Sequence, residues 1–79
     1  MKFDAEHLTK EQLSHKIGEQ IKYYRNQLGI SQAELARRCD KDKQHIELIE
    51  NGKVSPNIYT IYIISKALEI ELNQLIELK

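Results

Sequence analysis

The chain has few of the residues that form disulfides or bind metals, and it has no long hydrophobic segment. It has one cysteine among 79 residues, so no disulfide can form within it. Its three histidines, His7, His15 and His45, are scattered singly, without the spacing of a metal site. No apolar run is as long as a membrane span, and the charged start does not fit a signal peptide. We therefore expect no metal, no membrane partner and a cytoplasmic location.

The chain also lacks net charge and the motifs of catalysis. Its 12 basic residues balance its 12 acidic ones, which is unusual for a protein that binds nucleic acid. It has no glycine-rich phosphate loop and no nucleophile elbow. With 41% hydrophobic and 30% charged residues, it reads as one small globular domain that would gain from dimerisation. We expect neither an enzyme nor a cofactor, and no small-molecule ligand is evident.

Residues 30–53 carry the strongest local signal, because they predict two short helices with a tight turn between them. Ser31 is suited to cap a helix that begins at Gln32, and Glu34 can complete a capping box. At the turn, Asp40 can adopt the left-handed conformation at the cost of some strain. The apolar residues of this helix have helical spacing and are Ala33, Leu35, Ala36 and Cys39.

The second short helix is predicted over residues 43–51. Asp42 precedes it as an N-cap residue, and Gly52 follows as a stop signal. Ile46 and Ile49 mark its buried side, three residues apart. The candidate base readers project from the opposite side, and they are Lys43, Gln44, Glu47 and Leu48.

Residues 17–76 resemble the phage repressor and Cro family of helix-turn-helix proteins, also called the Xre family. The motifs that carry the resemblance are Gln32-Ala33-Glu34-Leu35-Ala36, Ile46 four residues before Glu50, Asn51-Gly52-Lys53, Pro56, and Ala67-Leu68. The resemblance implies an all-α fold, a compact five-helix lambda-repressor-like domain with the helix-turn-helix in its second and third helices. Among family members, the chain is similar to small stand-alone types such as Cro-like repressors and restriction-modification controller proteins.

The resemblance also implies residue roles. Gln32 would contact the DNA backbone, Lys43 and Gln44 would read base edges, and Leu48 would lie deeper along the groove. The chemistry agrees, because Gln fits the N6 and N7 edge of adenine, Lys donates to guanine, and Leu can contact a thymine methyl. Glu47 either accepts from cytosine or is a solvated residue. The predicted DNA-binding residues are Gln32, Arg38, Lys41, Lys43, Gln44, Glu47, Leu48, Asn51 and Lys53.

Several residues depart from the family's pattern. Asp40 stands where the turn usually has glycine, and Lys41 stands at a usually apolar position. The stem of Lys41 can lie on the core while its charge reaches a phosphate. Asp42 and Glu47 bring negative charge toward DNA. Residues 22–53 contain seven basic and five acidic residues. Because this excess of positive charge is small, DNA binding would depend on backbone N–H groups, hydrogen bonds and two protomers together.

A long first helix is predicted over residues 10–28. Thr9 and Gln12 can form a capping box before it, and Gly29 is suited to end it. By the resemblance, Arg25 on this helix forms a buried structural ion pair with Glu50, which would lock the first helix to the third. The apolar stripe of the first helix is Leu13, Ile17, Ile21, Tyr24 and Leu28.

Two domain segments are predicted. Residues 1–13 are an N-terminal extension that runs into the first helix, and residues 14–79 are a single helix-turn-helix domain. Phe3 and Leu8 can staple the extension to the domain. Alternatively, the extension reaches a partner subunit or DNA.

Two further helices complete the predicted fold. Asn57 is suited to cap a helix over residues 58–68, and a last helix is predicted over residues 71–78. The inner face of the first is Ile58, Ile61, Ile64, Ser65 and Leu68. Leu72 and Leu75 either close the core or join a subunit contact. The predicted dimer interface is Tyr59, Tyr62, Ile63, Ile76 and Leu78.

The sequence thus predicts a sequence-specific DNA-binding transcriptional regulator. As a homodimer it would place two recognition helices on half-sites about 34 Å apart, in a palindromic operator, and it would regulate its own gene. One alternative is a DNA-binding antitoxin of a toxin–antitoxin pair. Another is a protein-interaction module that uses the same fold without DNA, which the zero net charge favours.

Overall fold

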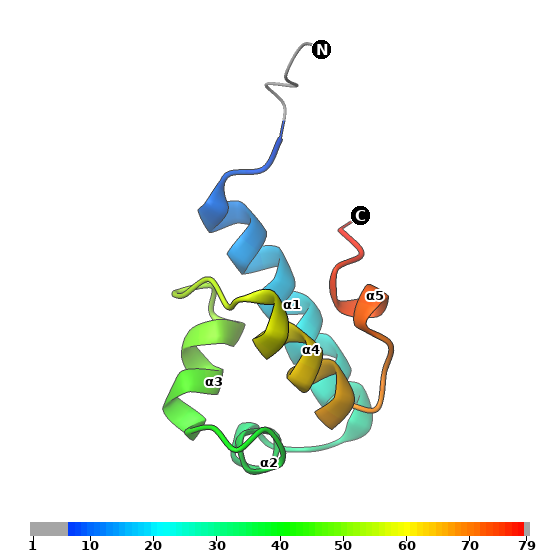
Figure 1. Ribbon diagram of the computed structural model, residues 1–79. Helices are drawn as coiled ribbons and strands as arrows, with labels where there is room; N and C mark the ends of the chain where they lie inside the picture. The colour runs from blue at the N-terminus through cyan, green and yellow to red at the C-terminus, as the bar shows by residue number, and fades with distance from the viewer. Residues whose placement is uncertain (1–6, 79) are drawn as a thin grey trace.

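The computed structural model describes residues 7–78, which form five helices and no strand. The helices are α1 (Lys10–Leu28), α2 (Gln32–Arg38), α3 (Lys43–Glu50), α4 (Ile58–Ala67) and α5 (Leu72–Leu75). In Figure 1, α1 runs diagonally through the domain, with α3 on one side and α5 on the other. The predicted all-α, five-helix fold is confirmed. Within the described residues, no helix combines the length and the apolar character needed to cross a membrane.

Helix α1 begins and ends where the sequence predicted. The Thr9 hydroxyl accepts from the Gln12 backbone N–H at 3.1 Å, and the Gln12 side chain accepts from the Thr9 backbone N–H at 2.9 Å. Gly29 ends the helix at φ 77°, where its N–H donates to the carbonyls of Arg25 and Asn26. The predicted role of Phe3 lies outside the described residues, whereas residues 10–13 form the first turn of α1.

The core lies where α1, α2, α3 and α4 meet, and α5 closes it. Its buried apolar members are Ile17, Ile21, Leu35, Ala36, Cys39, Ile46, Ile49, Ile61, Ile64, Leu68 and Leu75. Burial raises the pKa of the Cys39 thiol. Three residues that the sequence assigned to buried faces are exposed, namely Leu13, Ala33 and Ile58. Each lies in the first turn of its helix, outside the part that neighbouring helices cover.

The backbones of α1 and α3 touch at a glycine that the sequence did not single out. An ideal Cβ on Gly18 would lie 2.5 Å from the carbonyl oxygen of Ile49 and 2.6 Å from that of Glu50. No side chain fits at such distances. Gly52, at φ 68°, makes a similar close approach to α1, because an ideal Cβ on it would lie 2.8 Å from the Cα of His15. The two glycines hold the C-terminal end of α3 directly against α1.

The end of the fold differs from the sequence prediction. Asn57 caps α4 as predicted, accepting from the Thr60 N–H at 2.8 Å. The last helix, however, covers only Leu72–Leu75 instead of residues 71–78. The Gln20 side chain on α1 donates to the Gln74 carbonyl at 3.1 Å, so this end of the chain is held against α1. Leu75 is fully buried, so core closure is confirmed for this residue.

Candidate nucleic-acid interface

Helix α2 is capped at its start by one hydrogen bond and not by the predicted box. The Ser31 hydroxyl accepts from the Glu34 N–H at 3.0 Å. The Glu34 carboxylate turns instead to Arg37, at 2.6 Å, and to Arg38, at 3.0 Å. Hydrogen bonds from these two arginines lower the pKa of Glu34 to about 2. Because two guanidinium groups offer stronger partners, the carboxylate does not return to the cap.

The turn between α2 and α3 is a Schellman motif built on Asp40. Its φ is 54°, which confirms the predicted left-handed conformation. The Lys41 N–H donates to the Ala36 carbonyl at 2.9 Å, and the Asp40 N–H donates to Arg37 at 3.3 Å. Asp42 occupies the N-cap position of α3, but its side chain makes no capping hydrogen bond. The predicted N-cap position of Asp42 is therefore confirmed, without a capping hydrogen bond from its side chain.

The C-terminal end of α3 is fixed by a buried polar network. Arg25 Nε donates to Glu50 Oε2 at 2.6 Å, and Arg25 Nη2 donates to Glu50 Oε1 at 3.1 Å. Arg25 Nη1 also donates to the Ile30 carbonyl at 2.9 Å, and Gln32 Nε2 donates to Glu50 Oε1 at 3.0 Å. These contacts join α1, the α1–α2 loop, α2 and α3 at one carboxylate. They include the ion pair that the family resemblance implied.

The outer face of α3 carries the predicted base readers. Its inner face is buried through Ile46, Ile49 and Glu50, so the other side chains of the helix point outward. Lys43 Nζ lies 2.6 Å from Glu47 Oε1, one helical turn further on. The exposed residues along and just after this face are Lys43, Gln44, Leu48, Asn51 and Lys53. The structure therefore brings together five of the predicted DNA-binding residues, with Glu47 engaged by Lys43.

The other three predicted DNA-binding residues have neighbours inside the domain. Gln32 donates to Glu50, as described above, and Lys41 is half-buried in the turn. The Arg38 guanidinium donates to the Ala67 carbonyl at 3.0 Å and to the Glu69 carboxylate at 3.2 Å. Arg38 therefore ties α2 to the C-terminal end of α4. This contact could not be predicted from the sequence, because the partners are far apart along the chain.

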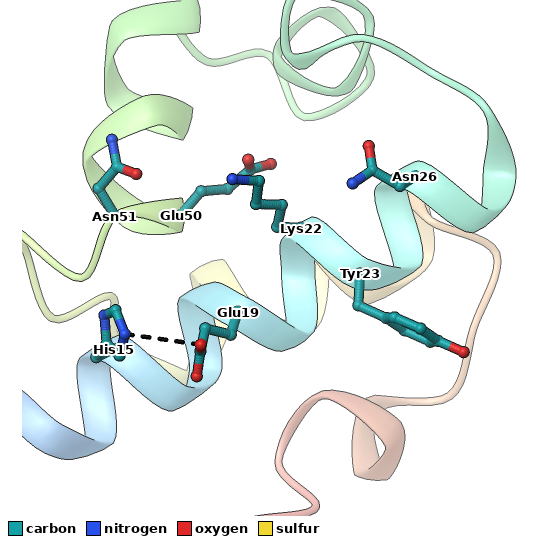
Figure 2. Close-up of a pocket in the computed structure, with 7 residues that line it drawn as sticks. All are labelled: His15, Glu19, Lys22, Tyr23, Asn26, Glu50 and Asn51. Carbon is teal, nitrogen blue, oxygen red and sulfur yellow. Dashed lines mark ion pairs between the residues drawn. The ribbon is translucent and has the colours of Figure 1, made fainter.

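A hollow of about 390 Å³ lies between α1 and the C-terminal end of α3. Its lining residues are His15, Glu19, Lys22, Tyr23, Asn26, Glu50 and Asn51. Figure 2 shows Lys22 reaching from α1 toward α3, while Tyr23 points to the other side of α1. His15 and Glu19 form an ion pair at 3.7 Å when the histidine is protonated. Sequence reasoning missed this hollow, since its walls come from two separate helices.

The described part of the chain offers no metal centre. Across residues 7–78, no group of three or more His, Cys, Asp or Glu side chains is arranged to hold a metal ion.

The geometry of α2, the turn and α3 defines a helix-turn-helix protein. The chain belongs to the helix-turn-helix family HTH_3, whose sequence model matches residues 21–75. This finding confirms the resemblance to Xre-type proteins. No curated protein matches the sequence.

Three solved structures are similar to the domain. The restriction-modification controller protein C.AhdI from Aeromonas hydrophila has 27% identity and a TM-score of 0.76, over 78% of this chain and 94% of that one. A hypothetical transcription factor, NHTF, from Neisseria has 25% identity and a TM-score of 0.79, over 95% and 86%. An HTH_3 family transcriptional regulator from Vibrio cholerae has 28% identity and a TM-score of 0.82, over 87% and only 39%. The fold is thus that of helix-turn-helix transcription regulators.

Proposed function

We propose that the protein is a sequence-specific DNA-binding transcriptional regulator that binds a palindromic operator as a homodimer and regulates its own gene. The observation that carries the proposal is the contrast between the two sides of α3. Its inner side is buried and held by the Arg25–Glu50 network. Its outer side presents hydrogen-bonding groups to solvent. A helix held in this way keeps its position relative to the rest of the domain when it enters the major groove.

The side chains on the outer face of α3 suit base recognition. Gln44 has a donor and an acceptor, which match the N6 and N7 edge of adenine, and Lys43 can donate to guanine. Leu48 is exposed one turn beyond Gln44, where it can contact a thymine methyl. For Lys43 to reach a base, its ion pair with Glu47 must open. That pair is exposed, so opening it costs little free energy.

Similarity to a controller protein supports the proposal of a regulator. The Aeromonas hydrophila structure is named as a restriction-modification controller protein, and the similarity covers 94% of its chain. We infer that the present domain likewise acts by occupying its operator.

An exposed apolar surface on α4 and after α5 supports the proposed dimer. Tyr59 is 67% exposed, and its ring centroid lies 6.4 Å from that of Tyr62, which is also exposed. Ile76 and Leu78 are exposed as well. Ile63 packs partly against the core, so it would contribute less than the tyrosines. Large exposed apolar side chains of this kind commonly mark interaction surfaces.

DNA binding is tested by fluorescence anisotropy with a duplex from upstream of the gene and a scrambled duplex of equal composition. We expect preference for the upstream duplex, and loss of that preference in the double variant Lys43→Ala with Gln44→Ala. The matched control is Lys16→Ala with Gln27→Ala, which removes the same two side-chain types from α1. Equal binding of the wild type to both duplexes would contradict autoregulation. Unchanged preference in the double variant would contradict the assignment to α3.

The dimer is tested separately by sedimentation velocity at micromolar concentration. We expect a dimer for the wild type and a shift toward monomer for Tyr59→Ser. A wild type that is monomeric both free and bound to DNA would contradict the homodimer and the palindromic operator.

The zero net charge favours a second candidate function, a protein-interaction module that has no need of DNA. A protein whose weak DNA binding is equal on all duplexes, and is unaffected by the change at Lys43 and Gln44, would support this candidate.

A further inference from the structure

The outer face of α3 continues into the hollow between α1 and α3. Gln44, Leu48 and Asn51 lie four and three residues apart, so they follow one line along the helix. Asn51, the C-cap residue of α3, is at the same time part of the hollow's wall. A molecule seated against the reading face of α3 therefore also reaches the hollow.

Lys22 is the cation at the centre of this hollow. Its side chain extends from α1 toward α3, between Asn51 near one end of the hollow and Asn26 near the other (Figure 2). Within residues 7–78, Lys22 has no ion-pair partner, and the side-chain amides of Asn26 and Asn51 have no hydrogen-bond partner. The charge of Glu50 is balanced by Arg25, with which it forms its ion pair at 2.6 Å.

The dimensions of DNA bring phosphates close to the protein surface on either side of a helix that lies in the major groove. An α-helix with its side chains is 10–12 Å across, and the major groove is about 12 Å wide. A helix that enters the groove therefore fills it, and the protein surface beside the helix meets the sugar–phosphate wall. The hollow is such a surface, since it lies directly beside α3.

We propose that Lys22 binds a DNA backbone phosphate in this hollow, with the Asn26 and Asn51 side-chain amides as additional donors. The proposal rests on the proposed DNA-binding function and adds a contact from α1 to it. A lysine ammonium pairs with phosphate as a point charge, and amide N–H groups commonly complete such contacts. The contact fixes the register of α3 on the duplex and carries no sequence information of its own.

Glu19 limits the strength of this contact and provides a second test of opposite sign. It lies in the same hollow, next to His15, where its negative charge opposes a phosphate. Removing that charge with Glu19→Gln should therefore strengthen DNA binding, whereas removing the positive charge with Lys22→Gln should weaken it.

The experiment measures the dissociation constants of wild type and Lys22→Gln at four salt concentrations, on the upstream and the scrambled duplex. We expect a several-fold loss of affinity, equal on both duplexes, because phosphates are the same in both. The slope of log K against log salt should fall by about 0.9 for each protomer bound. The matched control is Lys16→Gln, since Lys16 lies on α1 beside Glu77 and Leu78 and should keep the wild-type affinity and slope.

Three results would overturn the proposal. One is an unchanged affinity and salt slope in Lys22→Gln while the wild type binds DNA, and another is an equal loss in Lys16→Gln. A loss confined to the upstream duplex would show base reading instead of phosphate binding. If the wild type shows no salt-dependent DNA binding at all, the proposed function itself fails, so the two failures are distinguishable. Unchanged thermal melting of each variant confirms that the fold is intact.

Discussion

Two ion pairs, one between α1 and α3 and one within α3, have the same length and opposite surroundings. Arg25 and Glu50 approach to 2.6 Å with side chains that are 11% and 1% exposed. Lys43 and Glu47 also approach to 2.6 Å, with side chains that are 57% and 40% exposed. Water screens the second pair but is excluded from the first. Solvent exposure, and not distance, therefore separates a contact that holds the helix from one that can open.

This difference divides α3 into a fixed end and an adaptable end. The C-terminal end touches α1 through Gly18 and through the Arg25–Glu50 network. The N-terminal end carries an exposed pair that can open when a base or phosphate offers a better partner. The DNA-reading role proposed for α3 requires both properties, because base reading requires a fixed position and movable side chains.

The largest expected effect comes from breaking the buried pair. Arg25→Ala leaves the Glu50 carboxylate buried without its cation, which costs about 3–5 kcal/mol of unfolding free energy. Such a loss is a large part of the stability of a small domain. Urea denaturation of the variant and the wild type measures it. An unchanged free energy of unfolding, or an unchanged melting temperature, would contradict the structural role of the pair.

The next effect tests the backbone contact at the fixed end. Gly18→Ala in a helix interior would by propensity alone stabilise the domain, by about 1 kcal/mol. We expect destabilisation instead, by about 1–3 kcal/mol, because the new Cβ would overlap two carbonyl oxygens of α3. Thermal unfolding decides between the two signs. A more stable variant would show that α1 and α3 can separate at no cost.

A smaller effect is expected at the adaptable end. Glu47→Gln removes the exposed partner of Lys43 and one negative charge from the reading face. We expect several-fold tighter binding to both upstream and scrambled DNA, with a change in unfolding free energy below about 1 kcal/mol. Anisotropy and urea denaturation measure the two quantities. Weaker binding to the upstream duplex alone would show that Glu47 reads a base.

The smallest effect concerns the acid dependence of stability. The pKa of Glu34 in the folded protein is about 2, against an ordinary value of 4.5. Because the folded pKa is the lower one, the charged carboxylate stabilises the fold above pH 4.5, and this contribution is lost as the pH falls toward 2. Glu34 is exposed to solvent, so the loss is small. Melting temperatures of wild type and Glu34→Gln should converge over this range, and a constant difference would contradict the ion pairs of Glu34.

The sequence predicted those parts of the fold that depend on neighbours along the chain. The helix caps act within one helical turn, so they could be predicted from the spacing of residues along the chain. The capping residues are Thr9 with Gln12, Ser31, Asn57 and Gly29. The left-handed Asp40 followed from the same local reasoning. The burial of Ile46 and Ile49 also followed, because periodicity alone marks the inner face of α3.

The parts that the sequence did not predict depend on contacts between distant segments. Gly18 resembles any helical glycine until α3 is placed against it. The sequence predicts that Arg38 binds DNA. Its contacts with Ala67 and Glu69 could not be predicted, because they form only when α4 packs beside α2. The hydrogen bond from Gln20 to the Gln74 carbonyl of α5 also joins residues that are far apart along the chain. The hollow around Lys22 likewise exists only between two packed helices.

The most direct test of the division of α3 is a titration of the ¹⁵N-labelled protein with the upstream duplex, followed by NMR chemical shifts. We predict that the largest shifts fall on the exposed residues Lys43, Gln44, Leu48 and Asn51, with smaller shifts at Ile46 and Ile49. Shifts confined to Tyr59 and Tyr62, or an absence of shifts at saturating DNA, would contradict the assignment of α3 as the DNA-reading helix.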